Sequence, residues 1–282
     1  MANFFTGNFN LNDSKATAQF FPSHLVDRSL WPLMLSLSLF ALAISAVLSM
    51  HGYAHGGQLF ACAAILTVVG MLNWWQDVIA EAVYKGHHTK KVVSGILQAF
   101  NLFILSEVMV FLSVFWAYAH SSLSPAIEIG GVWPPYGITA LDAFGLPFLN
   151  TLLLLSSGAF ITYAHHSLIA NERYGLVSGI IFTVIMAGIF TSFQYIEYVE
   201  AGFSFADSAY GSAFYASTGL HGLHVIVGTI FIFIQFIRLL KSQLTTGHHL
   251  GLELSILYWH FVDIVWLFLF GMVYYWGGGT SA

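Results

Sequence analysis

The sequence predicts an all-α membrane protein with seven transmembrane helices. First, 57% of its 282 residues are hydrophobic and only 7% are charged, whereas a soluble domain carries about 25% charged residues. Second, seven apolar stretches are each long enough to cross a bilayer, which takes about 20 residues. They cover residues 33–51, 59–84, 95–119, 147–168, 174–198, 210–240 and 252–276. Third, all basic residues fall on one side of the membrane when the chain crosses it at these seven places.

The Lys and Arg residues support these spans in order along the chain. They lie before the first span, after the second, after the fourth and at the end of the sixth, and the other connections and the C-terminal end contain none. The positive-inside rule therefore places the N-terminus in the matrix or cytoplasm and the C-terminus outside. The basic residues are Lys15, Arg28, Lys85, Lys90, Lys91, Arg173, Arg238 and Lys241.

Two spans depart from the average length. The second ends in the polar run 74–77, so we expect its helix to leave the membrane and continue into water. The sixth, 210–240, is long enough to tilt or to project at one end. Tryptophans and tyrosines gather near the span ends, which is typical of the aromatic belt of a bilayer interface. The connections opposite the basic residues carry acids, and to these we assign Glu128, Asp142, Glu197, Glu200 and Asp207.

Composition excludes several other classes of protein. The net charge of −5 is spread along the chain, so there is no basic patch for nucleic acid. Cys62 is the only cysteine, which excludes an intrachain disulfide and a four-thiolate metal site. The first residues have neither the apolar core of a signal peptide nor the Arg content of a transit peptide. We divide the chain into a polar N-terminal extension, residues 1–23, and one membrane domain, residues 24–282.

Glu107 is the most informative candidate site residue. It lies near the centre of the third span, with no basic residue between Lys91 and Arg173. A carboxylate at bilayer depth is costly, so we expect Glu107 to be protonated. Two interpretations stay open. Glu107 binds protons, lipid or a polar partner inside the bilayer, or it is a protonated acid hydrogen-bonded between helices.

Two further pairs of polar residues stand one helical turn apart inside spans. His221 and His224 could bind a metal or face a heme, but we favour a buried hydrogen bond in a Gly-rich helix crossing. The imidazole of His260 can neutralise Asp263 and lower the cost of both groups in lipid. No titratable residue follows in 264–270, which disfavours a proton path along the seventh span.

Three adjacent histidine pairs, His87-His88, His165-His166 and His248-His249, are assigned to loops on the basic face. Neighbouring residues do not face each other on a helix, so we favour interfacial hydrogen bonds or lipid-phosphate contacts and predict no metal site. The segment 156–158, Ser-Ser-Gly, lacks the Gly-x-Ser-x-Gly elbow of a hydrolase and favours close helix packing.

Several motifs occur in an order that resembles subunit III of cytochrome c oxidase, over about 24–277. The family is identified from segments 74–79 (WWQDVI), 86–89 (GHHT), 106–109 (SEVM), 120–125 (HSSLSP), 131–135 (GVWPP), 218–229 (TGLHGLHVIVGT) and 258–270 (YWHFVDIVWLFLF).

The resemblance implies a fold in which the first two helices are separated from the other five by a V-shaped, lipid-filled cleft. It implies a core subunit without redox centres, with heme a and copper in subunits I and II of an enzyme that oxidises cytochrome c, reduces oxygen and pumps protons. This chain would bind phospholipid and stabilise subunit I in the mitochondrial inner membrane. Accessory subunits or a respiratory supercomplex are further expected partners. The alternatives are a bacterial plasma membrane location and a stand-alone proton or ion carrier that uses Glu107 with His260 and Asp263.

The resemblance also implies a lipid site. Glu107 matches the family's intramembrane glutamate, which faces the cleft and reacts with carbodiimide. The headgroup end of the cleft would be lined by Trp75, Glu81, His88 and Arg238, with Lys241 nearby. Gln76 and Ala80 depart from the pattern, because the family often has arginine at both positions. Their absence weakens the expected phosphate clamp.

Overall fold

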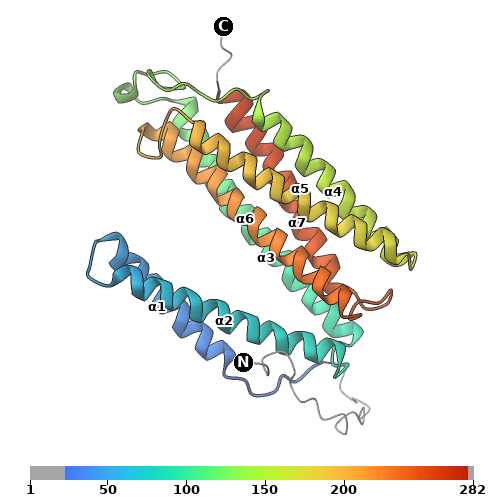
Figure 1. Cartoon of the computed structure of the whole chain (residues 1–282). Helices are drawn as coiled ribbons and strands as arrows, with labels where there is room; N and C mark the ends of the chain where they lie inside the picture. The colour runs from blue at the N-terminus through green and yellow to red at the C-terminus, as the bar shows by residue number, and fades with distance from the viewer. Residues whose placement is uncertain (1–22, 279–282) are drawn as a thin grey trace. The chain divides into compact units, whose positions relative to one another are not determined.

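The computed structural model describes residues 23–278, and these contain seven helices long and apolar enough to span a membrane (Figure 1). The predicted all-α fold and its seven spans are confirmed. The helices are α1 (Trp31–Met50), α2 (Gly56–Val83), α3 (Lys90–Leu123), α4 (Leu146–Ile169), α5 (Arg173–Glu200), α6 (Ser208–Leu240) and α7 (Leu250–Leu269), which continues as the π-helix η3 (Phe270–Trp276).

The helices extend beyond the apolar stretches where polar residues can still complete a helical turn. The largest extension is in α3, which begins at Lys90 and ends at Leu123 although the apolar stretch covers only 95–119. The assignment of His165 and His166 to a loop was wrong, because α4 continues to Ile169. The backbone N–H of Ala170 donates to the His166 carbonyl, so the helical hydrogen bonds close only after this pair.

The chain folds as two compact units, which meet in sequence between Ile96 and Leu97. Unit 1 contains α1 and α2, which run side by side as a hairpin (Figure 1). Gly56 is required at this turn, because a Cβ there would lie 2.7 Å from the backbone nitrogen of Ser49. The lipid-filled cleft, the orientation of the termini and the division at residue 24 stay predictions.

Unit 2 is a helical bundle in which α7 is the most deeply buried span. Two indole rings of α7, Trp259 and Trp266, lie in its core, and each donates a hydrogen bond to α4. The helices α4 and α5 also pack closely, because a Cβ on Gly179 would lie 2.8 Å from the Cβ of Ala164. Small residues at helix crossings let backbones approach in a membrane, where the hydrophobic effect drives no helix association.

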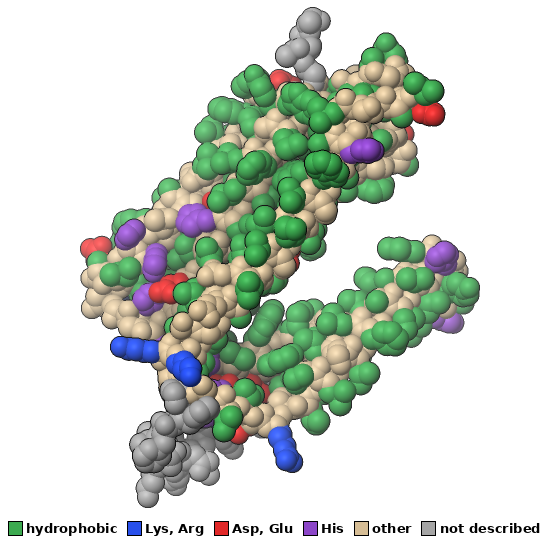
Figure 2. Space-filling model, turned by 180° about the vertical axis from the view of Figure 1, so that it is seen from behind, with side chains coloured by type: hydrophobic (Ala, Val, Ile, Leu, Met, Phe, Trp, Pro, Cys, Tyr) green, Lys and Arg blue, Asp and Glu red, His purple; other side chains and the backbone are tan. Residues whose placement is uncertain are grey.

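The surface of each unit is apolar, as a bilayer requires. Figure 2 shows hydrophobic side chains over most of the visible surface of both units. In unit 2 the indole N–H of Trp133, in the connection after α3, lies 3.3 Å from the Tyr118 hydroxyl and holds this connection against α3.

The two ends of unit 2 differ in charge. We call the end that carries Arg173, Arg238 and Lys241 its basic end.

Candidate functional site

Glu107 on α3 and His224 on α6 form a buried polar pair in unit 2. The Oε2 atom of Glu107 lies 2.9 Å from Nε2 of His224, and the two side chains are 21% and 9% exposed. The Nδ1 atom of His224 lies 2.8 Å from the Leu220 carbonyl, which can only accept. Nδ1 therefore carries a proton and donates it to this carbonyl. One further proton, on Glu107 or on Nε2, joins the carboxyl to the imidazole.

This pair gives Glu107 a partner within its own chain. The contact joins residues 117 positions apart, and sequence spacing does not reveal how α3 and α6 are rotated about their axes. Aromatic rings enclose the imidazole, with Phe111 in edge contact at 5.0 Å and Tyr258 stacked at 6.2 Å between centroids. The structure thus contains a hydrogen bond between helices, as in one of the two open interpretations of Glu107, and the protonation of Glu107 and its contact with lipid stay predictions.

His221 has a packing role, as predicted. Its Nε2 lies 3.2 Å from the Val262 carbonyl on α7 and therefore donates to it. Its ring lies in edge contact with Phe190 and 5.2 Å from the indole of Trp266. Although His221 and His224 are one turn apart and both contact α7, their Nε2 atoms bond to different helices, that of His221 to α7 and that of His224 to α3.

The predicted pair of His260 and Asp263 is also present. The Nδ1 atom of His260 lies 3.7 Å from Oδ2 of Asp263, and its Nε2 lies 3.2 Å from the Thr162 hydroxyl on α4. The Asp263 side chain is almost fully buried. Its Oδ1 has no hydrogen-bond partner within residues 23–278.

A buried carboxyl with two polar partners, which sequence reasoning missed, lies at the end of unit 2 opposite its basic end. The hydroxyl of Tyr274 donates to Oε1 of Glu197 at 2.6 Å, and Gln194 donates to the same hydroxyl at 3.3 Å. The assignment of Glu197 to an outer connection was wrong, because α5 continues to Glu200 and buries this carboxyl. The i, i+3 spacing of Gln194 and Glu197 could have indicated that these two side chains lie on the same face of a helix.

The basic end of unit 2 brings together His165 of α4 with His249 and Glu253 at the start of α7. One ligand atom from each lies within 4.8 Å of the others, and Nε2 of His249 lies 3.0 Å from Oε1 of Glu253. Nδ1 of His249 lies 3.0 Å from the Thr245 carbonyl, which orients Nε2 for a ligand. Two imidazoles and a carboxylate are zinc-type donors that leave a coordination position open. The sequence had suggested only adjacent pairs, whereas the structure combines members of two pairs.

The residues assigned to the lipid headgroup site belong to both units. In unit 2, Arg238 is mostly buried and its Nη1 donates to Gln235 at 3.0 Å, while Lys241 follows α6 and is exposed. In unit 1, Trp75 is exposed, and Oε2 of Glu81 lies 3.4 Å from Nε2 of His24. The lipid clamp, which includes His88, stays a prediction.

A second polar contact in unit 1 was missed by sequence reasoning. The Trp31 indole donates to Oδ2 of Asp77 at 2.7 Å and joins the start of α1 to the last turns of α2. The contact ties the polar run 74–77 of α2 to the start of α1.

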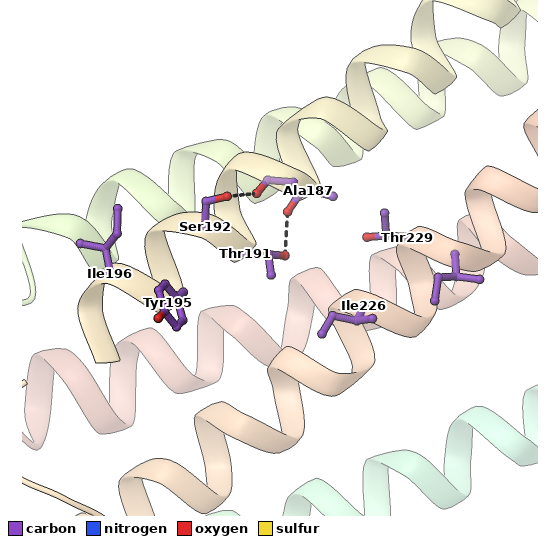
Figure 3. A pocket seen from close by; sticks show the side chains of 9 residues that line it. Ala187, Thr191, Ser192, Tyr195, Ile196, Ile226 and Thr229 are labelled. Atoms are coloured by element: carbon purple, nitrogen blue, oxygen red, sulfur yellow. Dashed lines mark hydrogen bonds between the residues drawn. The ribbon is translucent and has the colours of Figure 1, made fainter. Parts of the chain in front are cut away.

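An apolar groove lies between α5 and α6, with a volume of about 710 Å³ (Figure 3). Its hydroxyl groups are satisfied within their own helices, since Thr191 donates to Ala187 and Ser192 to Gly188, each at 2.9 Å. Thr229 likewise donates to Val225 at 2.7 Å. The groove therefore offers mainly methyl and methylene groups to a ligand.

The spanning helices and the ionisable side chains that they hold in pairs define a polytopic α-helical membrane protein. Residues 21–278 match a family model described as cytochrome c oxidase subunit III. The chain therefore belongs to the cytochrome c oxidase subunit III family.

Relatives named cytochrome c oxidase subunit 3 match nearly the whole chain. The protein of Schizophyllum commune is 54% identical over 260 residues, which cover 92% of this chain and 97% of the relative. That of Marchantia polymorpha is 51% identical over 263 residues, with 93% and 99% covered. That of Arabidopsis thaliana is 50% identical over 255 residues, with 90% and 96% covered.

These matches confirm the family that the motifs indicated. The chain is a subunit of cytochrome c oxidase, a respiratory oxidoreductase complex. It is a multi-pass protein of the mitochondrial inner membrane. The mitochondrial location is thereby preferred to the bacterial alternative.

Proposed function

We propose that this chain is a non-redox subunit that holds phospholipid and stabilises subunit I of the oxidase. Electron transfer and proton pumping then belong to subunits I and II, with heme a and copper. The observation that supports this division best is the contact between Glu107 and His224. A carboxyl that already has a partner between two helices of its own chain is explained without a transported ion.

The α5–α6 groove supports the lipid-holding part of the proposal. Its serine and threonine hydroxyl groups bond within their own helices, so an acyl chain beside them leaves none of these groups unsatisfied. Tyr195 lies at one end of α5 and is exposed, so its hydroxyl can contact a headgroup. At the basic end of unit 2, Arg238 and Lys241 supply positive charge for a phosphate.

A bulky side chain placed in the α5–α6 groove tests whether the groove holds phospholipid. Native mass spectrometry of the purified oxidase counts the phospholipids that remain bound to the complex. Gly188→Trp should release one phospholipid, because Gly188 lines the groove and is exposed, and a Cβ there meets no atom within 4 Å, so the indole fills the groove without entering the core. Leu223→Trp, at an exposed position of α6 that does not line the groove, is the matched control. An unchanged lipid count for Gly188→Trp would contradict the assignment.

The lifetime of the oxidase during catalysis tests whether this chain stabilises subunit I. Oxidase from which this chain has been removed should lose activity after fewer catalytic cycles than the intact complex, although its initial rate is similar. Equal lifetimes under turnover would refute the role.

The alternative is a stand-alone carrier that uses Glu107, His260 and Asp263. Reconstitution of this chain alone in liposomes separates the two functions. A carrier conducts protons across the vesicle membrane above the background of empty liposomes, whereas a structural subunit does not.

A further inference from the structure

The middle of α7 carries a polar group that is only half buried. The imidazole of His260 is 42% exposed, whereas the neighbouring Asp263 side chain is 8% exposed. His260 lies near the centre of the span Leu250–Trp276. The surrounding surface of α7 and α4 is apolar and exposed, with Leu257, Ile264 and Leu155. A polar ring at this depth normally faces the interior of a bundle.

The hydrogen bonds of this cluster are incomplete within residues 23–278. The Thr162 hydroxyl lies 2.8 Å from the Gly158 carbonyl and donates its only proton there. His260 Nε2 must therefore carry the proton in its contact with Thr162. Its Nδ1 lies 3.7 Å from Asp263 Oδ2, which is too long for a good hydrogen bond. The other oxygen of Asp263 is buried without a partner.

Close packing between α4 and α7 prevents the imidazole from moving inward. A Cβ on Gly158 would lie 2.5 Å from Asp263 Oδ2 and 3.6 Å from His260 Nδ1, so there is no spare space beneath the ring. The adjacent inward position is filled by the Trp259 indole, which donates to Ser157 at 2.9 Å. The exposed edge of His260 therefore stays at the surface of the seam between α4 and α7.

Lipid does not complete this site. Headgroups lie about 15 Å from the centre of a hydrocarbon core that is about 30 Å thick, and acyl chains neither donate nor accept hydrogen bonds. The α5–α6 groove differs in this respect, because its hydroxyl groups are satisfied by their own helices.

We propose that the α4–α7 seam around His260 is a docking surface for a transmembrane helix of another oxidase subunit. We define this surface by Leu155, Leu257, His260 and Ile264. The docked helix carries an uncharged hydrogen-bonding side chain, such as that of Ser, Thr, Asn or Gln, at the depth of His260. Its apolar side chains cover Leu257 and Ile264. This inference rests on the proposed function, in which the chain stabilises a membrane-embedded partner.

Photolabelling of the intact wild-type oxidase tests the surface directly. The probe is a phospholipid with a diazirine on its acyl chain, and labelled residues are identified by mass spectrometry. Ile264 on the docking surface and Ile230 in the α5–α6 groove are matched, being 56% and 53% exposed in the chain alone. We expect at least fivefold less labelling at Ile264 than at Ile230. Equal labelling of both residues in a complex that retains heme a overturns the docking surface.

Substitution of His260 tests the hydrogen bond. His260→Phe should reduce the fraction of this chain that co-purifies with heme a by about tenfold, the effect of one lost buried hydrogen bond. His260→Gln, which keeps a donor, should lose less. Leu223→Phe, at an exposed position of α6 outside the groove and outside the docking surface, should lose nothing. The amount of chain in the membrane is measured in each case, because a folding defect lowers that amount. Loss of heme a association in every variant, Leu223→Phe included, would count against the proposed function itself, whereas wild-type association in His260→Phe contradicts only this inference.

Discussion

Glu107 and His224 share a hydrogen bond of 2.9 Å between α3 and α6, although each residue lies in a strongly apolar segment. The carboxyl and the imidazole reduce each other's cost in the bilayer, because each supplies the partner that lipid does not. The pair links α3 to the rest of unit 2 at mid-membrane depth, together with aromatic contacts such as that of Phe111 with Phe261. Its first role is therefore structural.

Glu107→Gln should leave the proton-pumping stoichiometry of the oxidase largely intact, because the amide can still donate a hydrogen bond to His224. Protons released per electron in reconstituted oxidase are the measurement. Glu107→Leu should destabilise unit 2 by about 1–3 kcal/mol, since it leaves the His224 ring unpaired. Complete loss of pumping by assembled Glu107→Gln oxidase would show that this carboxyl belongs to the pump.

Gly158→Ala should destabilise the chain by about 1–3 kcal/mol, the usual cost of overpacking a tight helix contact. The added methyl group would collide with Asp263 at the crossing of α4 and α7. Gly222→Ala is the control, because a Cβ there meets no atom within 4 Å. Thermal denaturation of the purified oxidase compares the two, and equal midpoints would refute the close contact.

Tyr274→Phe should cost about 1–3 kcal/mol, because it removes the hydroxyl that donates to the buried Glu197 carboxyl. Tyr275→Phe tests a neighbouring exposed ring and should change stability by less than about 0.5 kcal/mol. Thermal unfolding of both variants provides the comparison. A neutral effect of Tyr274→Phe would mean that Gln194 alone satisfies the carboxyl.

Asp207 supplies a pH-dependent contact just before α6. The backbone N–H of Ser204 donates to its Oδ2 at 2.7 Å and lowers the pKa of this carboxyl below its ordinary value of 3.8. A lowered pKa in the folded state stabilises the fold above the ordinary pKa, and this contribution is lost as the pH falls through the lowered pKa.

Asp207→Asn should therefore lower the thermal midpoint at neutral pH, and the difference from wild type should shrink in acid. Glu200→Gln removes a negative charge at the end of α5 without removing this backbone contact, and it serves as the control. A difference that persists unchanged in acid would exclude the carboxylate as its cause.

The number and positions of the spans were predictable because a bilayer imposes one rule on the whole chain. Every backbone polar group must pair within its own segment, so long apolar stretches become helices. Contacts between helices were less predictable. The pair of His260 and Asp263 lies within one helix and was found from its spacing, whereas the partner of Glu107 depends on helix rotation, which spacing does not encode.

Helix ends explain the remaining errors. Glu197 and His165 lie where apolar stretches give way to polar residues, and both were placed in connections. In the structure the helices continue past them, so Glu197 pairs with Tyr274, and His165 approaches His249 and Glu253. Polarity marks the membrane interface, but a helix ends only where its backbone hydrogen bonds end.

The π-helix η3 at the end of α7 makes side-chain directions there depend on the exact number of residues in the segment. The N–H of Gly277 donates to the Met272 carbonyl, five residues earlier, so side chains after Phe270 do not follow the angular sequence of the preceding α-helix. One residue deleted from η3 would act as a rotation, turning Tyr274 away from Glu197 while His260 and Trp266 keep their directions. The number of residues in η3 therefore sets the direction in which the side chains after it point. A helical wheel of this span must be drawn separately for α7 and for η3.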